Sequence, residues 1–319
     1  MRRTLGRSGI EVSALGMGCW GISGVYRRRD TGGVSGWGPV DDDESIRAIH
    51  RAIDLGVTFF DTADVYGAGH SERVLGRALR DRRDRVVIAT KFGRIFDEGK
   101  REIVGDDSRP EHVQEACEAS LKRLGVQYID LYQFHIGNEE PGRAEAVREA
   151  LEKVVEAGKI RFYGWSTDDP GRARVFAGGK HCTAIQQHFN VFGGNKETLR
   201  VCEENNLASI NRGPLAQGIL TGKFTSESKL PDDDLRRGWD FERGPQADLL
   251  RKLEAIRELL TSGGRTPTQG AICWLWARSE KTIPIPGFKT VRQVEENAGA
   301  MSFGPLTTEQ VDEIDALLK

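Results

Sequence analysis

The sequence predicts an α/β protein that folds as a closed (β/α)8 TIM barrel, and two observations carry this prediction. Short apolar segments alternate with amphipathic segments along most of the chain, and eight such units can be counted. Three of the apolar segments also end on an ionisable residue, namely Asp61, Lys91 and His135. Because parallel barrel strands deliver their last residues to one rim, these three side chains are expected to meet at a single mouth.

An open, doubly wound sheet would show the same alternation of strands and helices. That fold usually carries a glycine-rich phosphate loop between its first strand and its first helix. Residues 16–21 read GMGCWG, and no helical pattern follows them. The closed barrel is therefore the preferred prediction.

Each element is predicted from its apolar spacing and its capping residues. A β-hairpin precedes the barrel, with strands at 2–5 and 11–14 and a turn at 6–9. The eight barrel strands are expected at 15–18, 57–60, 86–90, 129–134, 160–164, 184–187, 208–210 and 282–285. Amphipathic helices are expected at 42–55, 111–124, 144–157 and 247–260. Long loops are expected on the functional rim, at 20–40, 92–108 and 212–245.

Length and composition fit a single globular domain that covers residues 1–319. The chain has 38% hydrophobic and 29% charged residues, which is enough apolar mass for one large core. Its 46 basic and 48 acidic residues are interspersed and leave a net charge of −2, so nucleic acid and membrane partners are not expected. No apolar run could cross a bilayer, and the start of the chain lacks the apolar region of a signal peptide. A cytoplasmic monomer is the expectation.

The chain has five cysteines, which are widely spaced and never form a CxxC pattern. An odd number at such spacings argues against a disulfide framework and against a zinc site, so we expect free, buried thiols. No metal site is predicted, because neither His70 nor His188 has a partner at a ligand spacing, and His70 is expected to start a helix. The acidic run at 231–234 is expected to form a solvated turn.

The three strand-end residues are joined by a phenol at Tyr66, five residues after Asp61. An ammonium beside this phenol is expected to lower its pKa toward the working range, which would make Tyr66 a general acid. Asp61 is expected to keep Lys91 charged, and His135 to orient and polarise a carbonyl oxygen. Such a site suits carbonyl reduction. It needs a nicotinamide cofactor, because no side chain can donate a hydride.

These residues lie in stretches that resemble the signatures of the aldo-keto reductases. Residues 60–67 read FDTADVYG, residues 89–91 read ATK and residues 130–135 read DLYQFH, in the order that the family has them. The resemblance extends from about residue 5 to residue 301. It implies a (β/α)8 barrel and NADP(H)-dependent interconversion of carbonyls and alcohols. It also implies that Tyr66 is the proton donor and that Asp61, Lys91 and His135 support it.

The same resemblance implies which residues bind the cofactor. Ser166, Thr167 and Gln186 match the block that holds the nicotinamide carboxamide, although Thr167 stands where the family usually has asparagine. The pyrophosphate-side loop and the adenosine-binding stretch are matched by Leu215, Gln217, Gly218, Lys289, Thr290, Gln293, Glu296 and Asn297. Lys289 and Thr290 suit a 2′-phosphate, so NADPH is favoured. NADH use stays open, because Gln293 stands where some relatives have arginine.

Arg212 stands where many relatives stack a tyrosine on the nicotinamide. A guanidinium can stack on the neutral reduced ring, but it would repel the positively charged oxidised ring. We therefore expect this chain to prefer the reduced cofactor.

Two other functions stay open at this point. Lys91 at a strand end could form a Schiff base, which would make the protein a lyase. The chain could also be a regulatory or sensing subunit that binds NADPH with little turnover. If the protein is a carbonyl reductase, its substrate is a small carbonyl compound, and Trp20 and Trp37 are expected to form walls of the substrate pocket.

Overall fold

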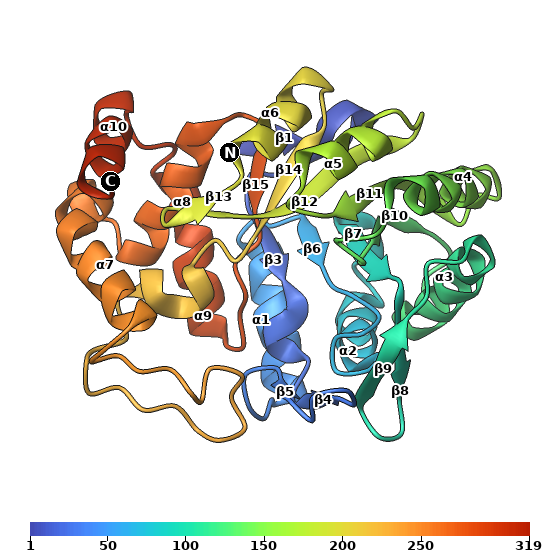
Figure 1. Cartoon of the computed structure of the whole chain (residues 1–319), viewed down its shortest axis with the longest axis horizontal. Helices are drawn as coiled ribbons and strands as arrows, with labels where there is room; N and C mark the ends of the chain where they lie inside the picture. The colour runs from blue at the N-terminus through green and yellow to red at the C-terminus, as the bar shows by residue number, and fades with distance from the viewer.

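Eight parallel strands form a nearly closed barrel, which confirms the predicted fold (Figure 1). The computed structural model describes all residues from 1 to 319. The barrel strands, in chain order, are β3 (Gly16–Gly18), β6 (Phe59–Asp61), β7 (Val87–Phe92), β10 (Ile129–Phe134), β11 (Ile160–Ser166), β12 (Cys182–Asn190), β14 (Ala208–Arg212) and β15 (Thr282–Pro284). The first strand returns to the end of the last, since the Gly18 amide donates to the Pro286 carbonyl at 3.0 Å.

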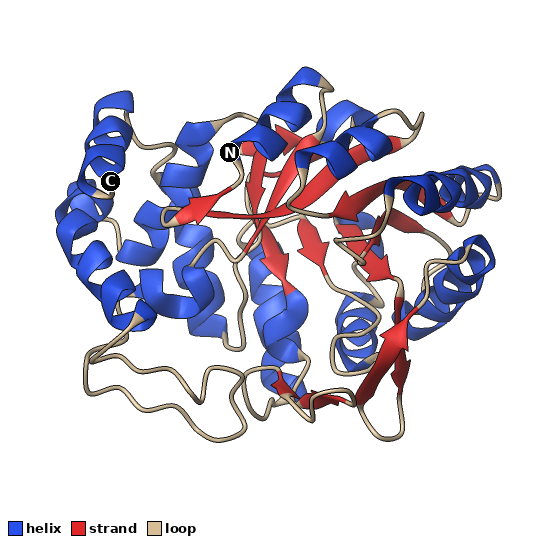
Figure 2. Ribbon diagram, in the orientation of Figure 1, coloured by secondary structure: helices blue, strands red, loops and turns tan.

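Helices cover the outside of the barrel, as Figure 2 shows in blue around the red strands. They are α1 (Asp42–Asp54), α2 (His70–Leu79), α3 (Pro110–Leu124), α4 (Pro141–Glu156), α5 (Pro170–Ala177), α6 (Lys196–Glu204), α7 (Pro245–Thr261), α8 (Pro267–Arg278), α9 (Val291–Gly299) and α10 (Thr308–Leu317). The four predicted helices are confirmed as α1, α3, α4 and α7, and His70 starts α2 as expected. Helix α4 begins three residues before the predicted start, because Pro141 fits the first turn of a helix.

The N-terminal hairpin closes the bottom of the barrel. Its strands are β1 (Arg2–Thr4) and β2 (Glu11–Ser13), which pair antiparallel. Leu5 and Val12 of this hairpin are fully buried in an apolar cluster with Phe59, Leu131 and other residues of the barrel strands. The lower barrel is therefore filled with apolar side chains, and polar groups are left to the opposite rim.

Two of the three long rim loops contain strands that the sequence did not predict. They are β4 (Tyr26–Arg28), β5 (Val34–Ser35), β8 (Arg94–Asp97) and β9 (Glu102–Asp106), and they form a separate sheet in the order β5-β4-β9-β8. These strands are two to five residues long and pair across distant parts of the chain. Segments of this length carry too little periodicity to be recognised in a sequence.

The third rim loop folds back over the mouth, and the prediction of a solvated turn there is wrong for Asp234. That residue is only 4% exposed. Its carboxylate pairs with Arg236 at 2.6 Å, and the Leu235 amide donates to the Gly36 carbonyl at 3.0 Å. Two rim loops thus meet, and Figure 1 shows this orange segment beside β5.

All five cysteines are buried and free. None of the helices combines the length and the apolar character needed to cross a membrane.

Candidate active site

A cavity of about 740 Å³ opens at the rim where the barrel strands end. Its volume lies in the range typical of small-molecule sites. Most of the residues singled out from the sequence line it, namely Trp20, Trp37, Asp61, Tyr66, His135, Ser166, Gln186, Arg212, Leu215, Gln217, Gly218, Lys289, Gln293, Glu296 and Asn297. Lys91, Thr167 and Thr290 do not line it.

Lys91 lies just beneath the cavity floor and is fully buried. Its Nζ donates to Asp61 Oδ1 at 2.5 Å, to the Thr62 carbonyl at 2.7 Å and to the Tyr66 hydroxyl at 3.2 Å. An ammonium has three donors and no acceptor, so these contacts use its whole hydrogen-bonding capacity. The Tyr66 oxygen therefore accepts from Lys91, which leaves its own hydroxyl hydrogen free for another partner.

The other oxygen of the Asp61 carboxylate is also fully engaged. Asp61 Oδ2 accepts from Gln133 Nε2 and from Gln186 Nε2, both at 2.8 Å. Gln186 Nε2 also lies 3.1 Å from Gln133 Oε1. Sequence reasoning missed Gln133. The signal was a polar residue inside an apolar strand, two positions before His135 and therefore on the same strand face.

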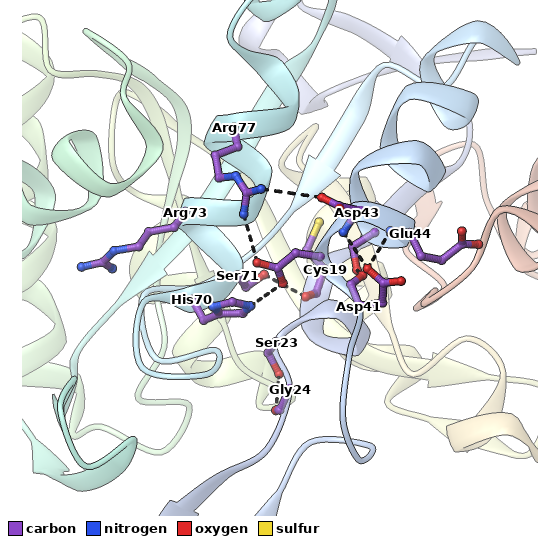
Figure 3. Close-up of polar contacts among 12 residues, drawn as sticks. Cys19, Ser23, Gly24, Asp41, Asp43, Glu44, His70, Ser71, Arg73 and Arg77 are labelled. Carbon is purple, nitrogen blue, oxygen red and sulfur yellow. Dashed lines mark hydrogen bonds and ion pairs between the residues drawn. The ribbon is translucent and has the colours of Figure 1, made fainter.

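The turn that carries Tyr66 is fixed by hydrogen bonds to its neighbours. Thr62 Oγ1 lies 2.9 Å from Ser71 Oγ. Ser71 Oγ donates to the Cys19 carbonyl at 2.8 Å, as Figure 3 shows. Gly67 has a φ of +63°, and a Cβ there would come within 2.2 Å of the Ser23 carbonyl oxygen. Only glycine fits this position, so the turn is held in one conformation.

Burial and charge act in opposite directions on the pKa values of Tyr66 and Lys91. Burial raises the pKa of Tyr66, and the nearby Lys91 ammonium only partly offsets this. The expectation of a lowered Tyr66 pKa is therefore wrong for this structure. For Lys91, burial alone would lower the pKa, but the Asp61 carboxylate and the Tyr66 hydroxyl together raise it above its ordinary value. Tyr66 is held neutral and Lys91 charged at neutral pH.

His135 lies across the cavity floor from the phenol, with its ring 5.9 Å from the Tyr66 ring in an edge arrangement. Burial lowers its pKa well below the ordinary value, and the positive charges of Lys91, Arg94 and Arg212 lower it further. The imidazole is therefore neutral at neutral pH. Its Nδ1 is buried without a hydrogen-bond partner, so the ring edge that reaches the cavity is the one that carries Nε2.

The aromatic side chains of Trp20 and Trp37 form one wall of the cavity. Their rings lie 5.3 Å apart, and the Trp20 ring lies 6.2 Å from the Tyr66 ring. Trp20 Nε1 donates to the Tyr26 hydroxyl at 3.0 Å, which fixes the indole plane.

One end of the cavity is basic, and two of its cations, Lys223 and Arg236, were missed from the sequence. Lys289 Nζ donates to the carbonyls of Trp37 and Pro39 at 2.7 and 2.8 Å. Arg236 and Lys223 also line this end. Arg236 is 6% exposed and donates to the Gln217 carbonyl at 2.7 Å. Nothing in the sequence pointed to Arg236, because its position depends on how the third rim loop folds.

The loop beside these cations has an unusual backbone. Ala216, Gln217 and Gly218 all have positive φ values, of 47°, 54° and 100°. The left-handed region costs a residue with a Cβ about 1 kcal/mol. Strain of this kind is typical of ligand clamps, where consecutive amide groups face an anion.

Three residues named for the cofactor have side chains engaged elsewhere. Thr167 Oγ1 donates to the Gly137 carbonyl at 2.7 Å, and the Thr290 side chain caps α9 by accepting from the Gln293 amide. Arg212 lines the cavity but pairs with Asp168 at 2.5 Å. Both side chains of this pair are half exposed, so it offsets the Arg212 charge only weakly, and the preference for the reduced cofactor stays a prediction.

The chain matches a known protein family over nearly its whole length. Residues 14–319 match the model of the Aldo/keto reductase family. The chain is 34% identical over 301 residues to "Aldo-keto reductase yakc [NADP(+)]" of Schizosaccharomyces pombe, which covers 91% of this chain and 84% of that protein. It is 35% identical over 305 residues to "Probable aldo-keto reductase 1" of Glycine max, which covers 93% of this chain and 83% of that protein.

Solved structures show the same similarity. The glycerol dehydrogenase AKR11B4 from Gluconobacter oxydans superposes with a TM-score of 0.85 at 30% identity, covering 99% of this chain and 94% of that one. An aldo-keto reductase from Klebsiella pneumoniae in complex with NADPH superposes with a TM-score of 0.70 at 26% identity. That match covers 100% of this chain and 95% of the Klebsiella chain.

The lowered pKa of His135 can be measured directly by NMR of the histidine rings. We expect its Cε1–H signal to stay constant as the pH falls from about 8 to 6.5, the ordinary histidine value, because the imidazole is already neutral there. The signal is assigned as the one missing from the spectrum of His135→Gln. A titration midpoint at or above 6.5 would contradict the neutral assignment.

Proposed function

Because the chain belongs to the aldo/keto reductase family, we propose that it is an NADP(H)-dependent oxidoreductase that reduces small aldehydes or ketones to alcohols. In this proposal it acts as a single-domain monomer in the cytoplasm. When bound, NADPH would supply the hydride, and the protein would supply the proton and position the substrate. The observation that carries the proposal is the hydrogen bonding around the Tyr66 hydroxyl.

Tyr66 is the proposed proton donor. Its oxygen accepts from Lys91 Nζ, so the phenolic hydrogen is free to point to a carbonyl oxygen in the cavity. During reduction the Tyr66 O–H bond breaks and its proton moves to that oxygen. The phenolate left behind is stabilised by the adjacent ammonium. The raised pKa of Tyr66 supports this role, because it keeps the phenol protonated until the carbonyl oxygen gains charge.

Lys91 is proposed to stay charged throughout. A Schiff-base lysine must be neutral and accessible to attack a carbonyl. Lys91 is fully buried, its three donors are used, and Asp61 and Tyr66 raise its pKa. These features argue against a lyase and favour an electrostatic role.

His135 is proposed to orient the carbonyl group. As a neutral imidazole with Nε2 toward the cavity, it can donate one hydrogen bond to the carbonyl oxygen without taking the proton that Tyr66 delivers. The hydrogen bond and the phenol would then fix the oxygen between two donors. This arrangement places the carbonyl carbon in one orientation for reduction.

The nicotinamide end of the cofactor is proposed to lie against Ser166 and Gln186. Gln186 Nε2 is already bonded to Asp61, so its free Oε1 is the atom suited to accept from the carboxamide. Thr167 would contribute through its backbone, since its hydroxyl is used by Gly137. Arg212 would lie along the ring while paired with Asp168.

The phosphates are proposed to lie at the basic end of the cavity. Lys223, Arg236 and Lys289 provide three positive charges there, as the phosphates of NADP(H) require. Leu215, Gln217 and Gly218 would face the pyrophosphate, and Thr290 would act by starting α9, whose N-terminus favours an anion. Gln293, Glu296 and Asn297 would face the adenosine, and the unpartnered Thr268 Oγ1 on the same wall is a further donor.

Removal of the Tyr66 hydroxyl tests the proposed chemistry. Tyr66→Phe should lower the rate of NADPH oxidation with 4-nitrobenzaldehyde about 1,000-fold, because a general acid contributes that order of rate. NADPH affinity should be retained, and the matched control Tyr128→Phe changes an exposed tyrosine outside the cavity. Equal rates for Tyr66→Phe and the parent would overturn the assignment. NADPH binding by a parent that turns over no aldehyde would instead favour a sensing role.

Lys289 should contribute to the preference for NADPH over NADH. We expect Lys289→Ala to reduce the preference for NADPH over NADH about tenfold, the value of one charge-assisted hydrogen bond. The readout is the ratio of the two dissociation constants. Lys281→Ala serves as the control, since that lysine bonds Asn206 away from the cavity. A ratio in Lys289→Ala equal to that of the parent would remove Lys289 from the 2′-phosphate site.

A further inference from the structure

The positive charges on the cavity wall are not all close to the proposed phosphate positions. Two carboxylates line it, those of Asp61 and Glu296. Six permanent cations line it as well, namely Arg28, Arg94, Arg212, Lys223, Arg236 and Lys289. Clefts lined by one sign of charge focus the field on whatever enters them.

Three of these cations lie close together, and the other three lie elsewhere on the cavity wall. Lys223, Arg236 and Lys289 lie within electrostatic reach of one another and form the basic end described above. Arg212 lies beside the proposed nicotinamide site. Arg28 and Arg94 belong to neither place, because both come from the four-stranded rim sheet at the substrate end.

The inner face of that sheet is part of the substrate mouth. On β4, Tyr26 and Arg28 are two residues apart and share one face. Ile103 of β9 pairs with Arg28 in register, and all three residues line the cavity. Tyr26 belongs to a small apolar cluster against which both Ile103 and Tyr66 pack. Arg94 lines the cavity from β8 and contributes to the low pKa of His135.

The carboxylates that pair with these two arginines lie outside the cavity. Arg28 pairs with Asp30 at 3.0 Å and Arg94 pairs with Asp106 at 2.6 Å. Neither Asp30 nor Asp106 lines the cavity, and their side chains are 61% and 43% exposed. Exposed ion pairs of this kind are weak. A carboxylate entering the mouth can therefore bind the same guanidinium groups.

We propose that Arg28 and Arg94 bind a carboxylate of the substrate, so that this enzyme prefers carbonyl compounds that carry a carboxylate beside a flat or aromatic body. The proposal rests on the proposed carbonyl reduction. The body would lie against the wall formed by Trp20 and Trp37, with its carbonyl oxygen at Tyr66 and His135. A guanidinium suits this role because its planar donors match the two oxygens of a carboxylate.

The test compares charged and neutral substrates of the same shape. The 2-, 3- and 4-carboxybenzaldehydes are each paired with the corresponding formylbenzamide, and the isomers vary the distance between the carbonyl and the anion. The readout is the ratio of kcat/KM for the acid to that for the amide, which we expect to fall about tenfold in Arg28→Gln or Arg94→Gln for the best isomer. Division of the variant ratio by the parent ratio cancels the intrinsic reactivity of each aldehyde.

Arg109→Gln is the matched control, because it removes the same charge from an arginine that pairs with Asp107 but does not line the cavity. This control should keep the parental ratio. The proposal would be overturned if Arg28→Gln and Arg94→Gln lowered kcat/KM for the acid and for the amide by the same factor, so that the ratio did not change. An unchanged ratio in a parent assayed at high salt would also overturn it, since salt screens the attraction of an anion.

Failure of the proposed function gives a different result. A protein that reduces neither member of any pair fails as a carbonyl reductase. Equilibrium binding to the NADP⁺-loaded protein then decides the arginine site on its own. The site is supported if benzoate binds more tightly than benzamide and Arg94→Gln removes the difference. Equal affinities of the parent for benzoate and benzamide would overturn it.

Discussion

The buried ion pair between Lys91 and Asp61 is the interaction on which the rest of the site depends. Two charges removed from water are costly unless each hydrogen-bonding group is satisfied. Here every donor of the ammonium and both carboxylate oxygens have partners. One of these partners is the Tyr66 hydroxyl, so satisfying the pair also orients the phenol. The same network ties together the four barrel strands β6, β7, β10 and β12.

The barrel explains why Asp61, Lys91 and the groups that they bond lie within hydrogen-bonding distance of one another. Parallel strands in register bring Lys91 on β7 opposite Gln133 on β10, and Asp61 on β6 opposite Ala89. The apolar hairpin seals the other end, which leaves the polar groups to one rim. The rim loops then add what the strands cannot provide. They supply an aromatic wall beside Tyr66 and the buried guanidinium of Arg236, which lies over the Trp37 ring.

Much of the fold and the meeting of Asp61, Lys91 and His135 at one rim could be predicted, because strand periodicity is local and each of these residues stands at or next to the end of a strand. Gln133 could have been found from the same alternation. The four-stranded rim sheet and the Asp234–Arg236 pair could not, since they arise from contacts between loops far apart in the chain. The pKa of Tyr66 was predicted in the wrong direction, because the extent of burial is not visible in a sequence. The contacts of Thr167 and Thr290 depend on backbone geometry, and their cofactor roles remain predictions.

The most direct test of this account is a double-mutant cycle on the ion pair, with free energy of unfolding and carbonyl reduction measured for each variant. Lys91→Met should lose about 3 kcal/mol of stability, because it leaves the Asp61 carboxylate buried without a cation. The double variant with Asp61→Asn should recover much of that stability. Its rate of carbonyl reduction should stay at least about 100-fold below the parent, because the phenolate then has no adjacent positive charge. Recovery of reduction together with stability in the double variant would contradict the account, since the pair would then serve only the fold.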